Sequence, residues 1–196
     1  IAFGQLSGEF LRTKVGPELD AFRFAQYAGA SGISKISAGA TLADGTAVVT
    51  ALRAGVNKMD EDEVDPNNRY LFITPTLYGM IRDLDTTKSK EVLETFAGII
   101  KVPQSRFYTA IDQYDGTTSS EEAGGYVKDS TNGCDINFMI IEKSAVIQFE
   151  KHVAPKIITP EQNQSADAYK FGYRNVGIAD VYKNKVAGIY LHYKAK

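Results

Sequence analysis

The spacing of hydrophobic residues predicts a long helix near the start of the chain, over residues 5–28. Apolar side chains recur at intervals of three and four, which places them on one helical stripe: Leu6, Phe10, Leu11, Val15, Leu19, Phe22 and Ala25. Gly16 and Pro17 interrupt the stripe, because proline lacks the amide donor of a helix interior and its ring clashes with the preceding turn. We therefore expect either a kink there or a new helix with Pro17 in its first turn.

Helical periodicity returns after a connector of small residues at 29–45. Asp44 is a suitable N-cap for a helix to about Met59, whose apolar face is Val48, Val49, Leu52, Val56 and Met59. Residues 69–73 form an apolar run typical of a buried strand. Thr74 and Pro75 then favour the start of a helix to about residue 84. A further amphipathic segment at 89–97 and a strand at 99–103 complete this part.

The second half of the chain has the pattern of β-structure. Residues 115–133 are polar and glycine-rich, so we expect an exposed loop. Residues 136–141 and 145–150 predict a hairpin with a turn at 142–144, and residues 169–182 and 189–193 predict two later strands. Helices come first and strands last, which predicts an α+β fold in which strands from the middle pair with strands near the C-terminus.

Composition narrows the class of protein. The chain has 196 residues, 43% of them hydrophobic, and a single cysteine. This length suits one domain, or two small ones sharing a core, and the composition excludes a disordered chain, collagen, a coiled coil and a disulfide scaffold. A net charge of −2 argues against a protein whose main role is to bind nucleic acid through a strongly basic surface. The longest apolar runs are too short to cross a bilayer. Because the sequence begins Ile-Ala-Phe-Gly, we expect a piece of a longer protein.

The acidic run at 60–65 is the first candidate for metal chemistry. A calcium loop beginning at Asp60 would need an oxygen ligand at its fifth position and glycine at its sixth, and this chain has Val64 and Asp65 there. We therefore interpret the run as a solvated helix end. Acidic residues are unfavourable at a helix C-terminus, so a cationic neighbour, from this chain or another subunit, is expected.

Other candidate chemistry is sparse. His152 and His192 are far apart in the sequence, and Cys134 lies in a glycine-rich turn. Neither a glycine-rich phosphate loop nor a nucleophile elbow is present in the sequence. The alternating aromatics Tyr169, Phe171 and Tyr173 suit either a base-stacking platform or, as we favour, the half-buried face of a strand. The sequence thus predicts no enzyme, no cofactor, and no catalytic, cofactor-binding or metal-binding residue.

Several segments resemble tailed-bacteriophage major capsid proteins, in order and spacing. Residues 68–78 resemble the element R-Y-L-x-x-[ST]-P-x-x-Y of that family, and residues 98–107 resemble its strand ending in Val-Pro-x-Ser-Arg. Residues 137–146, 163–174 and 180–190 are similar to the C-terminal strands of prophage capsid proteins from Gram-positive bacteria. Residues 8–24 resemble the family's spine helix, so the resemblance covers nearly the whole chain.

The resemblance implies the Hong Kong 97-type capsid fold. This fold has a peripheral domain, with a spine helix and long strands, and an axial domain, with a central sheet and flanking helices. By analogy we expect residues 1–64 and 156–196 to be peripheral and residues 65–155 to be axial. The loop at 115–133 would form the axial tip near the capsomer axis. The family's N-terminal arm and extended loop have no counterpart in this sequence, which implies an N-terminally truncated core that is monomeric or weakly associating.

The resemblance also implies a structural role. Such proteins self-assemble into hexamers and pentamers, and these form the icosahedral shell around the phage double-stranded DNA. The implied partners are other copies of the chain, scaffold, maturation protease and portal proteins, and DNA bound without sequence preference, but no membrane. Assembly would take place in the bacterial host cytoplasm and end in the virion. Two alternatives stay open: an encapsulin-like shell around protein cargo, and a small α+β enzyme or ligand-binding domain with a deep pocket.

Overall fold

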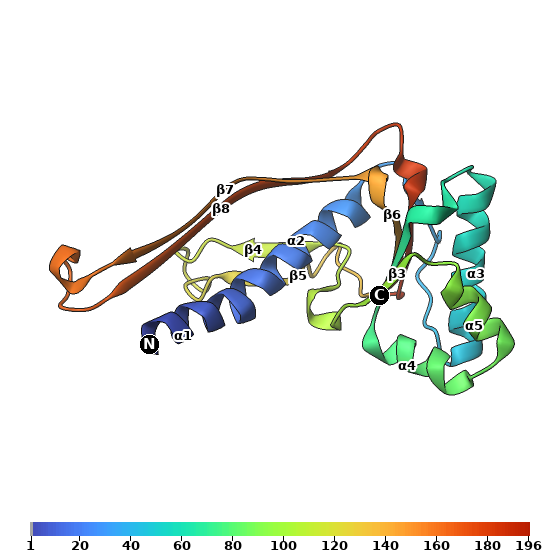
Figure 1. Ribbon diagram of the computed structural model, residues 1–196, viewed down its shortest axis with the longest axis horizontal. Helices are drawn as coiled ribbons and strands as arrows, with labels where there is room; N and C mark the ends of the chain where they lie inside the picture. The colour runs from blue at the N-terminus through green and yellow to red at the C-terminus, as the bar shows by residue number, and fades with distance from the viewer. Residues whose placement is uncertain (1) are drawn as a thin grey trace.

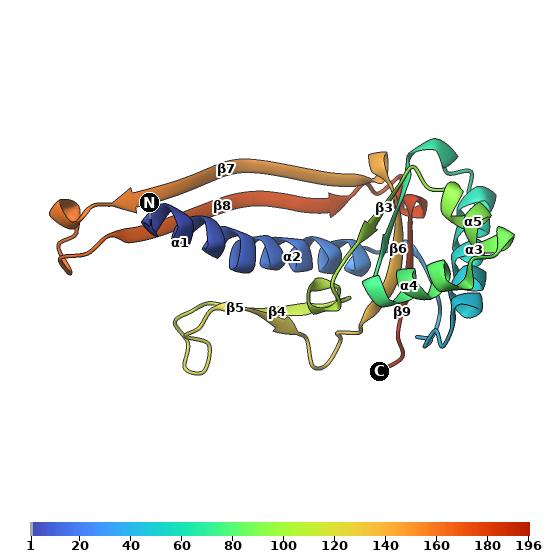
Figure 2. The same cartoon turned by 60° about the horizontal axis from the view of Figure 1, so that its bottom comes forward.

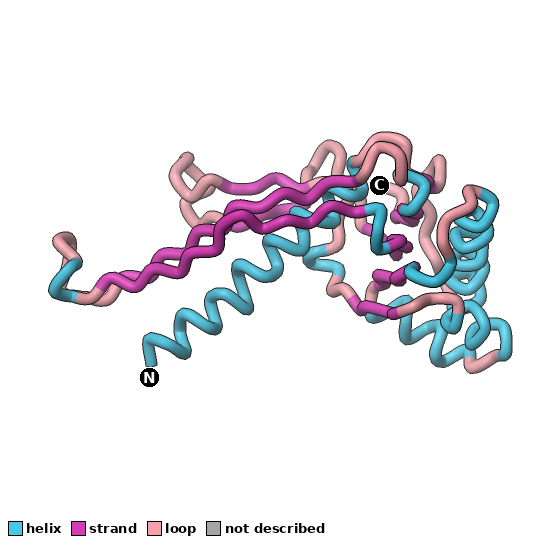
Figure 3. Tube along the Cα trace, turned by 45° about the horizontal axis from the view of Figure 1, so that its top comes forward, coloured by secondary structure: helices cyan, strands magenta, loops and turns pink. Residues whose placement is uncertain are grey.

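The computed structural model describes residues 2–196, which form an elongated molecule. A unit of one sheet and three helices occupies one end (Figure 1). A long helix and a long β-hairpin extend side by side from this unit toward the other end. Figure 3 shows the same arrangement from another side, with the N-terminus lying near the far end of the hairpin.

The N-terminal helix runs without a break over residues 2–29 and contains one wide turn. It consists of α1 (Ala2–Phe10), a π-helical segment (Leu11–Val15) and α2 (Gly16–Gly29). The amide of Gly16 donates to the carbonyl of Leu11, five residues earlier, which is the π-helical spacing. The expected interruption at Gly16 and Pro17 therefore takes the form of a wide turn directly before the proline, where the ring would otherwise meet the preceding turn.

The sheet unit is built on five strands in the order β1-β9-β6-β2-β3. Their bounds are β1 (Ser34–Lys35), β2 (Arg69–Ile73), β3 (Gly98–Lys101), β6 (Ile136–Glu142) and β9 (Ile189–Tyr193). Strand β6 is antiparallel to both β2 and β9, whereas β3 is parallel to β2 and β1 is parallel to β9. The predicted pairing of the middle of the chain with its C-terminal end is confirmed.

Three helices cover one face of this sheet: α3 (Gly45–Glu61), α4 (Pro75–Leu84) and α5 (Thr87–Glu94). The predicted cap of α3 is confirmed, since the Asp44 carboxylate accepts from the amide of Ala47 at 2.8 Å. Pro75 opens α4 as predicted. Helix α5 begins earlier than the sequence analysis placed it, because Thr86 and Ser89 form a reciprocal capping box.

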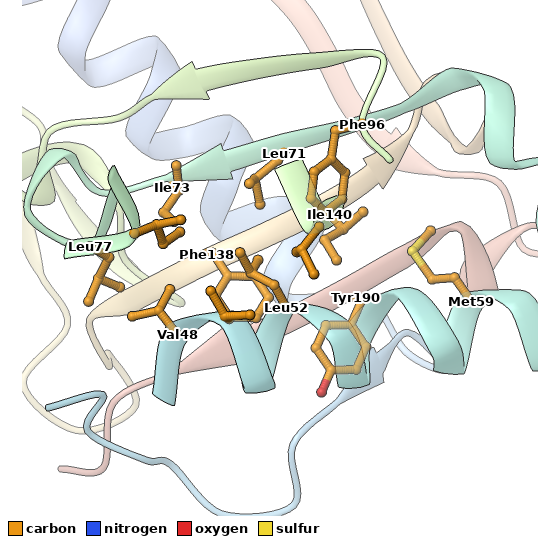
Figure 4. Packing of buried hydrophobic residues seen from close by; sticks show 13 residues of the cluster. Val48, Leu52, Met59, Leu71, Ile73, Leu77, Phe96, Phe138, Ile140 and Tyr190 are labelled. Atoms are coloured by element: carbon orange, nitrogen blue, oxygen red, sulfur yellow. The ribbon is translucent and has the colours of Figure 1, made fainter. Parts of the chain in front are cut away.

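The sheet divides the hydrophobic core into two layers. The layer under the three helices, shown in Figure 4, contains Val48, Leu52, Met59, Leu71, Ile73, Phe138 and Ile140. The layer on the opposite face meets the C-terminal end of α2 and contains Phe24, Tyr27, Phe107, Ile136, Met139 and Ile141. All seven residues of β6 are buried, which explains why five of them are apolar and why apolar and polar residues do not alternate along the strand.

The predicted hairpin between residues 136–141 and 145–150 is wrong. A short 3₁₀ turn (Lys143–Ala145) separates the two strands and leads the chain out of the central sheet. Strand β6 pairs with β2 and β9, while β7 (Val146–Ile158) pairs with β8 (Lys170–Val181) in a separate two-stranded sheet. Strand β6 is fully buried between β2 and β9 in the central sheet. Strand β7 is mostly exposed, so it could not bury β6 in this way.

The elongated end has three layers, with the helix in the middle. The β7–β8 hairpin lies on one side of α2, and a smaller ladder of β4 (Ile111–Tyr114) and β5 (Gly125–Lys128) lies on the other (Figure 2). The segment at 115–133, expected as a loop, thus includes a strand, and it lies along α2. Further short 3₁₀ turns span Pro66–Asn68, Gln104–Arg106, Pro160–Gln162 and Val186–Gly188.

Candidate functional site

A groove of about 720 Å³ lies between the N-terminal helix and the β7–β8 hairpin. Its walls are mainly apolar. The helix contributes Phe3, Leu6, Phe10, Leu19 and Phe22, and the hairpin contributes Phe149, Phe171, Tyr173 and Ile178. The helix and the hairpin extend side by side through the elongated end of the molecule (Figures 1 and 3), and the groove lies between them.

Strand alternation places the aromatic residues of β8 in this groove. Phe171 and Tyr173 are half-buried on the face toward the helix, while Gly172 and Arg174 between and beside them are exposed. The ring of Phe171 lies 6.4 Å from that of Phe3 and 6.1 Å from that of Phe10. The half-buried interpretation therefore holds for Phe171 and Tyr173, whereas Tyr169, the third aromatic of the predicted set, is 57% exposed.

Much of the apolar surface around the groove is exposed. Leu6 is 66% exposed, Ile178 is 61% exposed and Phe149 is 59% exposed. Leu6 and Phe10 belong to the apolar stripe that the sequence predicts for the helix. The helix reaches the core only toward its C-terminal end, where Phe24, Tyr27 and Ala28 are buried. Contiguous exposed apolar surface of this kind is typical of an interaction surface.

Arg23 closes the inner end of the groove. Its guanidinium Nη2 lies 2.5 Å from the Glu150 carboxylate on β7. With its amide oxygen turned toward the helix, Gln148 also accepts from Nη1 and Nη2 of Arg23, at 3.1 and 3.2 Å. These contacts attach the base of the hairpin to α2.

The other side of α2 is attached to the β4–β5 ladder. Glu18 accepts from the side-chain amide of Gln113 on β4 at 3.2 Å, and Asp20 accepts at 3.0 Å from Arg106 in the 3₁₀ turn that precedes β4. Polar contacts from one helix thus hold both projecting sheets. The helix therefore fixes the position of each sheet relative to the other.

The titratable residues singled out in the sequence are not brought together. His192 is buried, its ring stacks on Phe138 with centroids 4.9 Å apart, and burial lowers its pKa to about 4. His152 is exposed on β7, and Cys134 is half-buried where its amide donates to Thr109. Over residues 2–196, the structure contains no group of three histidine, cysteine, aspartate or glutamate residues placed to hold a metal ion.

The acidic run finds its cationic neighbours within this chain. Asp60 accepts from the buried guanidinium of Arg69 at 2.6 Å, and Asp62 pairs with Lys58 one turn earlier. Asp65 caps the following turn by accepting from the amide of Asn67 at 2.9 Å. These contacts agree with the interpretation of a solvated helix end and leave the calcium template without support.

The chain is similar to known proteins in structure but not in sequence. No protein-family model matches the chain, and no curated protein sequence matches it. A solved structure from Mycobacterium phage Che8 superposes with a TM-score of 0.57 at 10% identity, over 91% of this chain and 58% of that one. The virus-like particle from Pyrococcus furiosus gives a TM-score of 0.60 at 11% identity, over 90% and 62%.

The capsid of cyanophage P-SCSP1u gives a TM-score of 0.56 at 17% identity, over 92% of this chain and 61% of that chain. The chain therefore spans about three fifths of the length of these proteins. At such low identity the likeness establishes the fold, which is shared over nearly the whole described chain. None of the described helices is both long and apolar enough to serve as a membrane span.

Proposed function

Because the chain has the fold of phage capsid proteins, we propose that it is the core of a major capsid protein that builds a virus shell. The observation that supports this proposal is the superposition of at least 90% of the chain on each of three shell-related structures. An elongated outline and a half-exposed apolar hairpin also suit a protein whose main partner is another copy of itself.

In finer detail, the proposal is the Hong Kong 97-type arrangement. The long helix would be the spine helix and, with β8, would belong to the peripheral domain, while β2, β3, β6, α4 and α5 would belong to the axial domain. We keep residues 1–64, 65–155 and 156–196 as the proposed division. Helix α3 and strand β9 pack directly on β6, so they would join the peripheral segments to the axial core. The position of residues 115–133 near a capsomer axis stays a prediction.

The proposed assembly is an icosahedral shell of hexamers and pentamers around phage DNA, formed in the host cytoplasm with scaffold, protease and portal proteins. A second candidate, a shell around protein cargo as in encapsulins, is favoured by the similarity to the virus-like particle from Pyrococcus furiosus. Both candidates need the same self-association, and they differ in what the shell contains.

Electron microscopy of the full-length gene product tests the proposal. Closed shells are expected, and nuclease-resistant DNA inside them would favour the phage capsid, whereas a co-purifying protein inside them would favour the cargo shell. Ile178→Asp, which charges an exposed apolar position without touching the core, is expected to prevent shell formation while leaving circular dichroism unchanged. Small soluble oligomers from the unaltered protein would overturn both candidates.

A further inference from the structure

Three cations surround one glycine on the outer face of the β7–β8 hairpin. Lys156 is the cross-strand partner of Gly172, and Lys170 and Arg174 lie two residues to either side of that glycine on β8. Cross-strand partners and residues two apart share one face of a sheet, so the three cations point to the same side. We call Lys156, Lys170 and Arg174 the cationic strip.

The strip has no anionic partner within the described part of the chain. All three side chains are exposed, and none takes part in an ion pair found in residues 2–196. Gly172 leaves the space between them open, since a Cβ atom there would approach only the carbonyl oxygen of Lys156, at 3.9 Å. Like charges on neighbouring strand positions are unfavourable, and a bound anion would relieve this repulsion.

The acidic counterpart in this chain is the loop that joins β4 to β5. Asp112, Asp115, Glu121 and Glu122 lie in or beside it, and no lysine, arginine or histidine occurs between residues 107 and 127. Asp112, Asp115 and Glu122 are exposed. Hydrogen bonds from the hydroxyl and amide of Thr118 and the amide of Thr117 hold the pKa of Asp115 well below its usual range, so this carboxylate stays charged.

A copy of the chain cannot join its own loop to its own strip. Helix α2 lies between the hairpin and the β4–β5 ladder, and it contacts both (Figure 2). The strip lies on the opposite face of β8 from Phe171 and Tyr173, which line the groove toward the helix. Strip and loop therefore point away from each other in one molecule, and their complementary charges can meet only between molecules.

We infer that the cationic strip of one copy binds the acidic β4–β5 loop of a second copy. Because the two surfaces differ, the contact is heterologous, and repeated contacts of this kind close into rings or continue as open filaments. The inference deepens the proposed function by naming the two surfaces that meet. Nucleic acid is a less suitable occupant, since the same face continues into the exposed apolar Val176, which matches a protein surface better than phosphates.

Reciprocal charge reversal tests the contact. The strip variant is K156E/K170E/R174E and the loop variant is D112K/E122K. Sedimentation velocity over a concentration series, in low and in high salt, measures self-association of the unaltered chain and of each variant. Each variant alone is expected to associate roughly tenfold more weakly than the unaltered chain, since each places like charges opposite each other. An equimolar mixture of the two variants is expected to recover association, because each then offers the charge that the other needs.

Two further variants make the result specific. K14E/K88E/K183E changes the net charge by the same amount as the strip variant, but at exposed lysines outside the cationic strip. It is expected to associate like the unaltered chain. Gly172→Glu places a tethered carboxylate among the three cations, so it is expected to weaken association without removing any of them. Circular dichroism and thermal unfolding check that every variant is folded.

The outcomes separate this inference from the proposed function. The inference would be overturned if the mixture did not recover association, or if the unaltered chain showed no measurable self-association. It would also be overturned if the strip variant lost duplex-DNA binding in a filter assay but kept its self-association. Shells that form normally from a charge-reversed full-length protein would also overturn it and leave the capsid proposal standing. Charge-dependent association by a protein that never forms shells would support the contact and reject the capsid.

Discussion

The Nδ1 atom of His192 lies 3.1 Å from the amide nitrogen Nδ2 of Asn137, and both side chains are buried between β6 and β9. The same amide nitrogen donates to the carbonyl of Ala40 at 2.8 Å, so its orientation is determined and the imidazole nitrogen must accept. Asn137 thus links the connector at 36–44 to His192, and its hydrogen bond to the imidazole requires a neutral His192.

This arrangement predicts a loss of stability in acid. Burial lowers the pKa of folded His192 to about 4, against roughly 6.5 for an unfolded histidine. The unfolded state therefore binds a proton first as the pH falls. The stability that depends on neutral His192 is fully present above about pH 6.5. It declines as the pH falls from about 6.5 to about 4 and is lost below that, and the total loss in the free energy of unfolding is about 3 kcal/mol.

Chemical denaturation at a series of pH values measures this effect. His192→Gln is expected to flatten the dependence between those two pH values, since glutamine can accept from Asn137 without titrating. His152→Gln changes the exposed histidine and is the matched control, expected to leave the profile unchanged. A steep decline in stability that persists in His192→Gln would contradict the assignment.

Glycine-to-alanine changes at two helical positions are predicted to have opposite signs. A Cβ atom on Gly55 in α3 would lie 2.9 Å from side-chain atoms of both Ile140 and Tyr190, so the alanine overpacks the core and costs about 1–3 kcal/mol. A Cβ atom on Gly8 in α1 meets nothing within 4 Å, so alanine there gains up to about 1 kcal/mol of helix propensity. Urea unfolding of both variants checks the pair, and a stabilised Gly55→Ala would show that the helix can move away from the sheet.

Arg69 and Asp60 are predicted to contribute unequally to stability, although they form one ion pair. The Arg69 side chain is buried, and it also donates to the carbonyls of Val64 and Asp65, so Arg69→Met should cost about 2–4 kcal/mol. Asp60 is mostly exposed, so Asp60→Asn should cost at most about 1 kcal/mol. Thermal unfolding distinguishes the two, and equal losses would mean that the ion pair, not the backbone contacts, supplies the stability.

The contact of Arg23 with Glu150 is predicted to set the order of the hairpin base. Arg23→Gln removes the charge that joins α2 to β7, so amide hydrogen exchange in residues 146–150 and 177–181 should accelerate severalfold. Global stability should fall by only about 1 kcal/mol, since Glu150 is partly exposed. Arg12→Gln, which breaks the exposed pair with Glu9, is the control, and similar exchange in both variants would contradict this role.

Local chemistry made most helices predictable. Asp44 and Pro75 determine where α3 and α4 begin through contacts within a few residues, and such signals can be read from the sequence. The wide turn before Pro17 was visible as an interruption but not as a π-helical segment, because its form depends on how the helix continues on both sides.

Strand pairing was less predictable because it depends on distant residues. Nothing local to residues 136–150 shows that β6 is buried between β2 and β9 while β7 turns outward to β8. The groove was missed for the same reason. Leu6 and Phe171 each fit an ordinary amphipathic pattern, and only the tertiary arrangement places them on opposite walls of an open groove.

The hairpin has a consequence for the chain before any shell forms. In the described residues β7 and β8 pair only with each other, so each strand leaves one long edge of backbone donors and acceptors unused. Such edges can fuse with one another into aggregates. Pro155 removes one donor from β7, and the repulsion between the cationic strips of two like hairpins opposes their alignment. The charges that we propose to attract the acidic loop of another copy would thus also oppose edge-to-edge aggregation of subunits that have not yet assembled.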